Sequence, residues 1–317
     1  MQDAHMPWQF LSRNLATFTL LGAIAAYIYP PAFLIFKDYF LWFFGATMFA
    51  LGLVMKPEEA KEALGKPLTI FIGVTAQFTV MPLLGFLAAT LTISMGASPA
   101  LALGFIIVGC APGAMASNVI SYLLGGAVAF SIAMTMLATT LSPLLTPTLV
   151  AWLGGAFMDI PFWPMMQTIL LTVALPLAVG MIIHQQLPQF QTHYERIAPD
   201  FAALAIIIIC AYAVAANQGR IAETPWIVFA LVVILNAGGY LAGWLIGGFF
   251  NFDKRYQITL AIEIGMQNAG LGVALALKHF EPETALPGAL FAVWCILTAA
   301  GLSRWKKIKT TDSVPAV

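Results

Sequence analysis

One acidic side chain interrupts an apolar stretch of this sequence, and it is the residue best placed to do chemistry. The chain has 14 Asp and Glu residues. Only Glu263 stands mid-run, in ITLAIEIGMQNAGLGVALAL. A charge at the centre of a bilayer costs about 2.5–3.5 kcal/mol. Because no Lys or Arg lies inside such a run to neutralise it, the sequence predicts a mobile partner, either a metal cation or a proton.

The residues that follow Glu263 predict a break in its helix. Gly265, Gln267, Asn268 and Gly270 come in close succession. Glycine lowers helix stability by about 1 kcal/mol, and Asn is a weak helix former. A broken helix in a membrane frees backbone carbonyls that face a cavity. Carboxylate, amide and carbonyl oxygens are hard ligands, which suit a cation such as sodium.

A second apolar run, GFIIVGCAPGAMASNVISYLLGG, carries a similar interruption. Pro112 removes a helical hydrogen bond and disturbs the preceding turn. Gly113 comes next, and Ser117 and Asn118 follow in the next turn. We expect a half-helix that begins near Ala114, whose N-terminal amides would attract an anion.

Further polar side chains lie in two other apolar runs. Gln77 stands in GVTAQFTVMP, where its amide needs hydrogen-bond partners. Ser131 and Thr135 are four residues apart and therefore share one helical face. Serine and threonine in membrane helices often bond to their own backbone, so Gln77 is the stronger indication of a site.

Composition assigns these runs to a membrane. The chain of 317 residues is 61% hydrophobic and 9% charged, whereas soluble domains carry about 25% charged residues. A net charge of zero offers no basic face for nucleic acid, and no phosphate-binding loop for ATP is found. The sequence therefore indicates an all-α polytopic protein surrounded by membrane lipid.

Ten apolar segments approach the length of about 20 residues that a membrane span needs. They are residues 14–36, 38–55, 67–93, 98–124, 126–152, 163–187, 198–217, 224–250, 255–277 and 284–304. Each half of the chain holds five, and an odd number inverts the second half relative to the first. The sequence therefore predicts ten transmembrane helices in two inverted five-helix repeats, an arrangement that recurs in secondary transporters.

Basic residues favour one side of this predicted topology. Eleven would lie on one side: Arg13, Lys56, Lys61, Lys66, Arg196, Lys254, Arg255, Arg304, Lys306, Lys307 and Lys309. Three would lie on the other: Lys37, Arg220 and Lys278. Cytoplasmic loops are enriched in Lys and Arg. We therefore expect a protein of the inner (plasma) membrane with both termini in the cytoplasm.

Several strings resemble the bile acid:sodium symporter family, especially its bacterial members. They are GVTAQF at 73–78, PGAMASNV at 112–119, SPLLTP at 142–147, EIGMQNAGL at 263–271 and LPGALFAVW at 286–294. The resemblance implies a panel domain from 14–66 and 163–217 and a core domain from 67–152 and 224–304. It also implies broken, crossing fourth and ninth helices and sodium-coupled uptake of an organic anion by alternating access, with no need for an oligomer.

The resemblance also implies two sodium sites and a substrate site. The first sodium site is Ser117, Asn118, Ser131, Thr135 and Glu263. The second is Gln77, Glu263 and Gln267 with the backbone carbonyls of Ile264 and Met266. The substrate site comprises Ala114, Met115, Ala116, Asn268 and Cys295, of which Asn268 and the half-helix amides would anchor a carboxylate.

The predicted substrate region departs from the family pattern. Small polar residues are replaced by Met115 and Ala116, and a His-Asn pair by Cys295 and Ile296. In the eighth segment the corresponding pair reads Leu235-Asn236. This less polar pocket favours a small carboxylate, pantoate-like or a 2-oxo acid, over a bile acid.

Two other functions are open to the same residues. Glu263 would also serve proton-coupled transport of an organic anion. An intramembrane enzyme would need a second buried carboxylate, a buried His or a metal cluster beside Glu263, and the sequence shows none of these. We therefore expect a transporter and not an enzyme.

Overall fold

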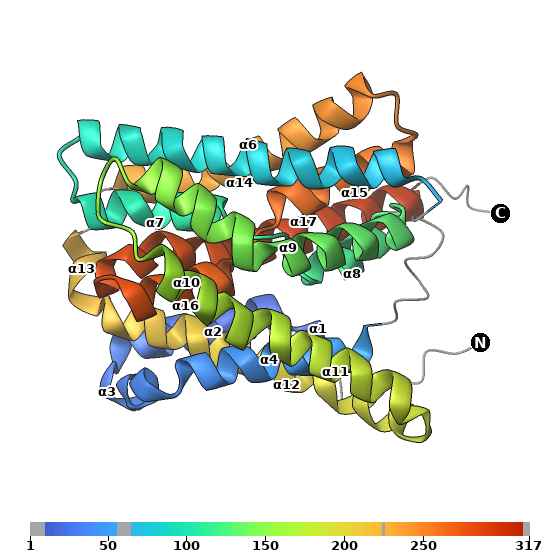
Figure 1. The fold of residues 1–317 in the computed structure, drawn as a ribbon, viewed down its shortest axis with the longest axis horizontal. Helices are drawn as coiled ribbons and strands as arrows, with labels where there is room; N and C mark the ends of the chain where they lie inside the picture. Colours follow the sequence, from blue (N-terminus) through green and yellow to red (C-terminus); the bar gives the residue numbers. More distant parts are fainter. Residues whose placement is uncertain (1–9, 56–64, 224–225, 313–317) are drawn as a thin grey trace.

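The computed structural model describes residues 10–55, 65–223 and 226–312, and this part of the chain is helical without a β-strand. Figure 1 shows long helices lying roughly side by side. The main elements are α1 (Phe10–Arg13), α2 (Leu15–Ile28), α3 (Pro31–Leu34), α4 (Phe40–Val54), α6 (Pro67–Ser94), α7 (Pro99–Gly109), α8 (Ala116–Leu123), α9 (Val128–Gly154), α10 (Phe162–Ile169), α11 (Leu175–Gln186), α12 (Gln191–Ala216), α13 (Gln218–Glu223), α14 (Trp226–Phe249), α15 (Lys254–Gly265), α16 (Ala269–His279) and α17 (Leu286–Asp312). Short helical turns join some of them: η2 (Ile35–Asp38), η4 (Leu170–Ala174), η5 (Pro188–Phe190) and η6 (Pro282–Ala285).

Six helical stretches in the described residues are long and apolar enough to cross a membrane. They are Pro67–Ser94, Val128–Gly154, Phe162–Gln186, Pro188–Ala216, Trp226–Phe249 and Pro282–Ala299. A seventh results if the bent pair Leu15–Ile28 and Pro31–Asp38 forms one span. The chain is thus an all-helical, multi-pass membrane protein. The count of ten spans and the inverted repeat stay predictions.

The first expected segment, 14–36, is wrong as a single helix. The chain bends by 110° between α2 and the helical stretch that starts at Pro31. Two consecutive prolines, Pro30 and Pro31, explain the bend, because proline lacks an amide donor and its ring clashes with the preceding turn. Of the basic residues used for topology, Lys56 and Lys61 lie outside the described residues.

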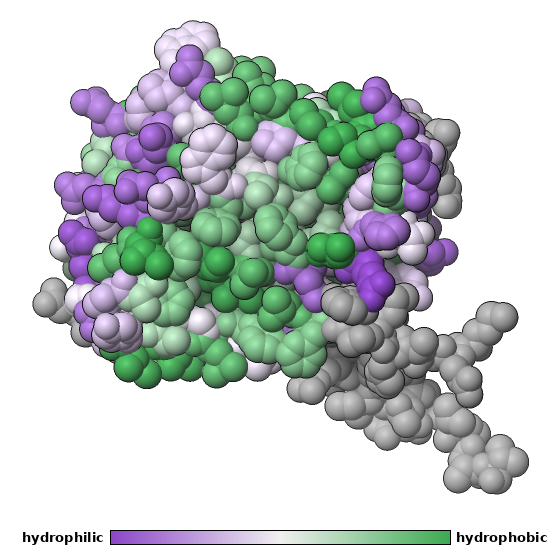
Figure 2. Space-filling view, turned by 90° about the horizontal axis from the view of Figure 1, so that it is seen from below, coloured by the Kyte–Doolittle hydropathy of each residue, from purple (hydrophilic) through white to green (hydrophobic). Residues whose placement is uncertain are grey.

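The surface has the pattern of a membrane protein. Figure 2 shows an apolar band across the middle of one face, with hydrophilic residues gathered towards both ends. Large apolar side chains such as Trp42, Leu171 and Leu245 are exposed. In a bilayer these side chains would face lipid, which removes the cost of exposing them to water.

The helices gather in two groups. α4 packs against α11 and α12, and α2 packs against α12; all four lie along the lower side of Figure 1. In the other group α6 packs against α7 and α9, and α14 packs against α15.

Small residues bring α14 and α15 into close contact. A Cβ atom on Gly239 would lie 2.8 Å from the Cα of Gly265, and one on Gly243 would lie 2.6 Å from the Cα of Ala261. Glycine at such positions lets the backbones of two membrane helices approach each other. α14 therefore holds α15, the helix that carries Glu263, in a fixed position.

Candidate functional site

The two interrupted segments cross at their breaks. The fourth segment stops at Gly109 and resumes at Ala116, and the ninth stops at Gly265 and resumes at Ala269. The Ala114 amide donates to the Met266 carbonyl at 2.8 Å. The Asn268 amide donates to the Pro112 carbonyl at 2.8 Å. These bonds form an isolated antiparallel bridge between Gly113 and Gln267, so each break supplies partners for the backbone groups that the other leaves free.

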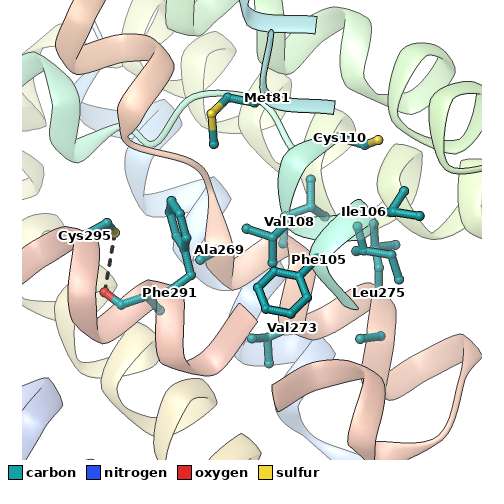
Figure 3. Close-up of a cluster of buried hydrophobic side chains, with 14 of the residues drawn as sticks. Met81, Phe105, Ile106, Val108, Cys110, Ala269, Val273, Leu275, Phe291 and Cys295 are labelled. Atoms are coloured by element: carbon teal, nitrogen blue, oxygen red, sulfur yellow. Dashed lines mark hydrogen bonds between the residues drawn. The ribbon is translucent and has the colours of Figure 1, made fainter. Parts of the chain in front are cut away.

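Local sequence explains where each break lies. Pro112 cannot donate a backbone hydrogen bond, which ends the first half of the fourth segment. On the other strand of the crossing, the side chain of Asn268 accepts from the Leu271 amide at 3.1 Å and caps the start of α16. In Figure 3, side chains of α7 and α16, among them Phe105, Val108 and Val273, pack together in a buried cluster.

Glu263 lies beside this crossing and is 1% exposed. Its Oε1 accepts hydrogen bonds from the hydroxyls of Ser117 on α8 and Ser131 on α9. Its Oε2 accepts from the Thr135 hydroxyl at 3.0 Å. The Thr135 hydroxyl is also 3.4 Å from Oδ1 of Asn118. The structure therefore brings together all five residues of the first predicted sodium site.

The environment of Glu263 contains oxygen but no fixed positive charge. Ser117, Ser131 and Thr135 are completely buried. Within the described residues, the recorded partners of the carboxylate are these three hydroxyls. Hydroxyl donors orient a carboxylate without neutralising it, and a buried charge without a counter-charge is costly. The arrangement is suited to a cation that shares these oxygens.

The Gly113 backbone approaches the carboxylate closely. A Cβ atom at Gly113 would lie 2.9 Å from Oε2 of Glu263 and 3.4 Å from its backbone oxygen. The Met266 carbonyl oxygen is 3.9 Å from the same point. Any side chain at this position would therefore occupy space beside three oxygen atoms.

A second polar group lies at the same crossing. Nε2 of Gln77, on α6, donates to Oε1 of Gln267 at 3.0 Å and lies 3.4 Å from the Ala111 carbonyl. Gln267 donates to the Ile264 carbonyl at 2.8 Å. Both glutamines are 1% exposed, and Oε1 of Gln77 is buried without a hydrogen-bond partner. A buried amide oxygen with no donor fits a cation ligand.

The second predicted sodium set is only partly joined by direct contacts. Gln77, Gln267 and the Ile264 carbonyl form one chain of hydrogen bonds. The Met266 carbonyl instead accepts from the Ala114 amide. No recorded hydrogen bond joins the Glu263 carboxylate to Gln77, so in the described structure Glu263 belongs to the first group.

The site differs in its ligand types from the sites of soft and borderline metals. The described residues contain no group of three or more His, Cys, Asp and Glu side chains that could hold a metal ion. Soft and borderline metals prefer such groups, whereas sodium accepts hydroxyl, amide and carbonyl oxygens. A single carboxylate with neutral oxygens is a ligand set for a hard monovalent cation.

The predicted substrate residues are placed less favourably. The half-helix begins at Ala116, close to the predicted start near Ala114, and the Ala114 amide itself donates to the Met266 carbonyl. The Asn268 side-chain oxygen caps α16. In the described structure the amides of Met115 and Ala116 have no recorded acceptor. Two amides are therefore left free at the start of α8 in the described structure.

Apolar contacts surround this end of α8. Ala114 and Ala116 pack against a cluster that contains Met266 and Ala299. Cys295, on α17, is 3% exposed, and its thiol bonds to the Ala292 carbonyl of its own helix at 3.5 Å. Figure 3 shows this bond next to Phe291. The weakly polar substrate region stays a prediction.

A further polar network reaches the break from α14 and α17. Asn236 stood in the predicted substrate region, but Thr298 and Tyr240 were not predicted to belong to the site. Nδ2 of Asn236 donates to the Gly265 carbonyl at 2.9 Å, and the Thr298 hydroxyl donates to Oδ1 of Asn236 at 3.0 Å. The Tyr240 hydroxyl lies 3.3 Å from that of Thr298. An amide in the middle of an apolar segment was the available signal, the same one that identified Gln77.

Comparison with known proteins agrees with this geometry. Residues 41–224 match the model of the Sodium Bile acid symporter family. The uncharacterized sodium-dependent transporter YocS of Bacillus subtilis is 32% identical over 302 residues, which cover 95% of this chain and 93% of YocS. The probable sodium/metabolite cotransporter BASS1 of Arabidopsis thaliana, a chloroplastic protein, is 33% identical over 248 residues, 78% of this chain and 61% of BASS1. The chloroplastic BASS2 of Oryza sativa subsp. japonica, also a probable sodium/metabolite cotransporter, is 30% identical over 298 residues, 93% of this chain and 70% of BASS2. The family model covers more than half of the chain and YocS almost all of it, and the chain therefore belongs to the sodium bile acid symporter family.

Proposed function

We propose that this protein is a sodium-coupled symporter of a small organic anion. One observation carries the proposal: the buried Glu263 carboxylate is surrounded by three hydroxyls at the crossing of two broken helices and has no recorded cationic partner. Broken helices that meet inside a membrane bundle are typical of transporter ion sites. The relatives whose names include sodium-dependent transporter and sodium/metabolite cotransporter support the choice of ion.

Two sodium ions are proposed at the crossing. The first would be held by Ser117, Asn118, Ser131, Thr135 and Glu263. The second would be held by Gln77, Glu263, Gln267, Ile264 and Met266, the last two through backbone carbonyls. The unpartnered Oε1 of Gln77 supports the second set, and the position of the Glu263 carboxylate close to Gly113 at the crossing supports its shared use by both ions.

The anion would bind at the start of α8, next to the first ion. The amides of Met115 and Ala116 point out of a helix N-terminus, where the helix dipole is positive. A bound sodium ion beside Ser117 would add to this positive potential, so that cation and anion favour each other's binding. The apolar surroundings, which include Met266 and Ala299, favour a small carboxylate of the pantoate or 2-oxo type over a bulky steroid. Cys295 is proposed as a further residue of this region.

Alternating access requires two bodies that move relative to each other. We propose that the panel comprises 14–66 and 163–217 and that the core comprises 67–152 and 224–304, in ten spans related as two inverted repeats with both termini cytoplasmic. The packing of α4 on α11 and α12 supports the panel grouping. Each sodium ion that enters down a potential of 100 mV contributes about 2.3 kcal/mol, and this drives uphill uptake of the anion.

The site is tested by sodium-dependent thermal stabilisation of the purified protein. A ligand that binds only the folded state at about 100 times its Kd stabilises by about 2.7 kcal/mol. We expect sodium chloride to raise the Tm of the natural chain relative to potassium chloride, and Glu263→Gln to remove this difference. The matched control is Glu281→Gln, the same change at an exposed position. A Glu263→Gln protein with a full sodium response would refute the assignment, and a response to pH alone would favour proton coupling.

A further inference from the structure

A second layer of oxygen atoms lies one helical turn from the Glu263 group, towards the end of the molecule where α15 begins. Ser121 follows Ser117 by four residues on α8, and Thr259 precedes Glu263 by four residues on α15. Each pair therefore shares a helical face. α8, α9 and α15 pack against one another, and Ser121 and Thr259 are both completely buried. A row of polar atoms thus extends from the proposed ion site along the contact between α8, α9 and α15.

The Ser121 hydroxyl is not used by the part of the chain that the structure describes. It is buried without a hydrogen-bond partner. A serine in a membrane helix ordinarily bonds to the carbonyl four residues earlier, and a buried hydroxyl without a partner is unfavourable. A buried hydroxyl one helical turn from Ser117 is explained if it binds an ion that moves between the helices.

A turn at residues 124–127 covers this layer, and its hydrogen bonds with α8 and α15 are made to their oxygen atoms. The Thr259 hydroxyl accepts from the Ala127 amide at 2.8 Å, and the Gly126 amide donates to the Ser121 carbonyl at 2.7 Å. Beside Gly126, at the point where a Cβ would sit, the Thr259 hydroxyl, the Ser121 carbonyl and the Arg255 carbonyl lie at 2.5, 3.1 and 3.4 Å. Gly125 adopts a positive φ of 67° in the same turn, a conformation that glycine adopts without strain.

We propose that this layer is a transient sodium site on the route between Glu263 and the end of the molecule where α15 begins, and that the turn at 124–127 is its gate. The inference rests on the sodium function proposed above. Hydroxyl and carbonyl oxygens are suitable sodium ligands. The absence of a carboxylate from this set makes the site weaker than the one at Glu263, and a transit site must bind weakly enough to release its ion.

Cysteine accessibility tests the route. Ser121→Cys in the full-length chain would be treated, in inside-out membrane vesicles, with a small cationic methanethiosulfonate reagent. Cys110, Cys210 and Cys295 are buried, so the unsubstituted chain gives the background. We expect Ser121→Cys to react at least tenfold faster than the matched control Thr139→Cys. Thr139 also has a buried, unpartnered hydroxyl, but it lies beyond Thr135 on the opposite side of the Glu263 group. Sodium in place of potassium should slow the reaction of Ser121→Cys severalfold.

The outcomes separate this route from the proposed function. Ser121→Cys that reacts no faster than Thr139→Cys, or equally in sodium and potassium, would overturn the transit site. Thr259→Cys, from the facing helix, repeats the measurement if Ser121→Cys does not fold. Sodium stabilisation of the natural chain, measured on the same preparation, shows whether the Glu263 site stands when the route fails. If sodium does not stabilise the natural chain, both the function and the route are wrong.

Discussion

At the scale of single residues, the site depends on what is absent next to Glu263 as much as on what is present. The carboxylate has three hydroxyl partners, and Gly113, which has no Cβ, lies close beside it. A substitution that crowds the carboxylate and a substitution that removes an oxygen should therefore weaken sodium binding by different physical routes.

Gly113→Ala tests the close approach of Gly113 to the Glu263 carboxylate. The added methyl group would lie 2.9 Å from Oε2 of Glu263, so either the carboxylate moves or the cation is excluded. We expect the sodium-dependent rise in Tm to disappear while the protein still folds. Gly248→Ala is the control, because a Cβ there meets nothing within 4 Å; it should keep the full sodium response. An unchanged sodium midpoint in Gly113→Ala would show that the ion does not lie beside this glycine.

Thr135→Val tests the oxygens with almost no change of shape. It removes the hydroxyl that donates to Glu263 at 3.0 Å. Hydrogen bonds to charged groups contribute about 1.5–3 kcal/mol, so the sodium midpoint should rise about tenfold or more. Thr140→Val makes the same change on the same helix, where the exposed hydroxyl bonds only to the Met136 carbonyl, and should shift the midpoint little. Similar midpoints for the two variants would remove Thr135 from the ion site.

Residue types in apolar runs were sufficient to predict much of this site. Glu263 and Gln77 stand out in the sequence because lipid cannot satisfy a carboxylate or an amide. The roles of Ala114 and Asn268 were not predictable in the same way. One amide pairs across the crossing, and one side chain caps α16. Both uses depend on how two segments far apart in the chain meet, which spacing within either segment does not reveal.

At the scale of elements, the breaks are held open by their neighbours as well as by their own sequence. Gly265 ends α15, and its carbonyl accepts from Asn236 of α14. The close approach of α14 at Gly239 makes that bond possible. Composition predicted that the ninth segment would break, but not that an amide from the eighth segment would satisfy the freed carbonyl. The bend after α2 is the opposite case. The two prolines, Pro30 and Pro31, were sufficient to predict it from local sequence, but hydropathy alone did not reveal it.

Asn236→Leu should destabilise the break. The substitution keeps the approximate size of the side chain but leaves the Gly265 carbonyl without its donor, at a cost of about 1–3 kcal/mol. We expect a lower Tm in potassium and a weaker sodium response, since Gly265 lies between the Ile264 and Met266 carbonyls proposed as ligands. Thr298→Val is the graded comparison. It removes the bond to Oδ1 of Asn236, together with the contacts of the same hydroxyl with the Cys295 carbonyl and Tyr240. The bond from Asn236 to the Gly265 carbonyl stays in place, so the effect should be smaller. An Asn236→Leu protein with natural stability and sodium response would show that the break supports itself.

At the scale of the whole molecule, the two halves of the ninth segment differ in their neighbours. α16 packs against α4, α10 and α12, whereas the main contacts of α15 are with α6, α8, α9 and α14. The ring of Phe44, on α4, lies 3.5 Å from where a Cβ on Gly270 would sit. Of the two halves, α16 is therefore the one with the larger contacts to the proposed panel. With the cytoplasmic side as proposed from the basic residues, we propose that these contacts close the outer side of the site, as in an inward-facing state. Hydropathy predicted the segments, but it carries no information about which state is occupied, because both states would use the same segments.

Thr168→Val tests the contact that joins the domains at the α16 end. The Thr168 hydroxyl, on α10, lies 2.9 Å from Nε2 of His279, the last residue of α16. A ligand-free transporter distributes between states that differ by a few kcal/mol. The loss of one partly buried hydrogen bond, worth about 0.5–1.5 kcal/mol, should therefore change the populations severalfold. Spin labels at the exposed positions Tyr122, on α8, and Gln185, on α11, would report the distance between the domains at the opposite end. We expect a larger population at short distances in Thr168→Val. Thr172→Val should not produce it, because that hydroxyl bonds to the Thr168 carbonyl of its own segment. Identical distance distributions for Thr168→Val and the natural chain would mean that this hydrogen bond does not hold the α16 end closed.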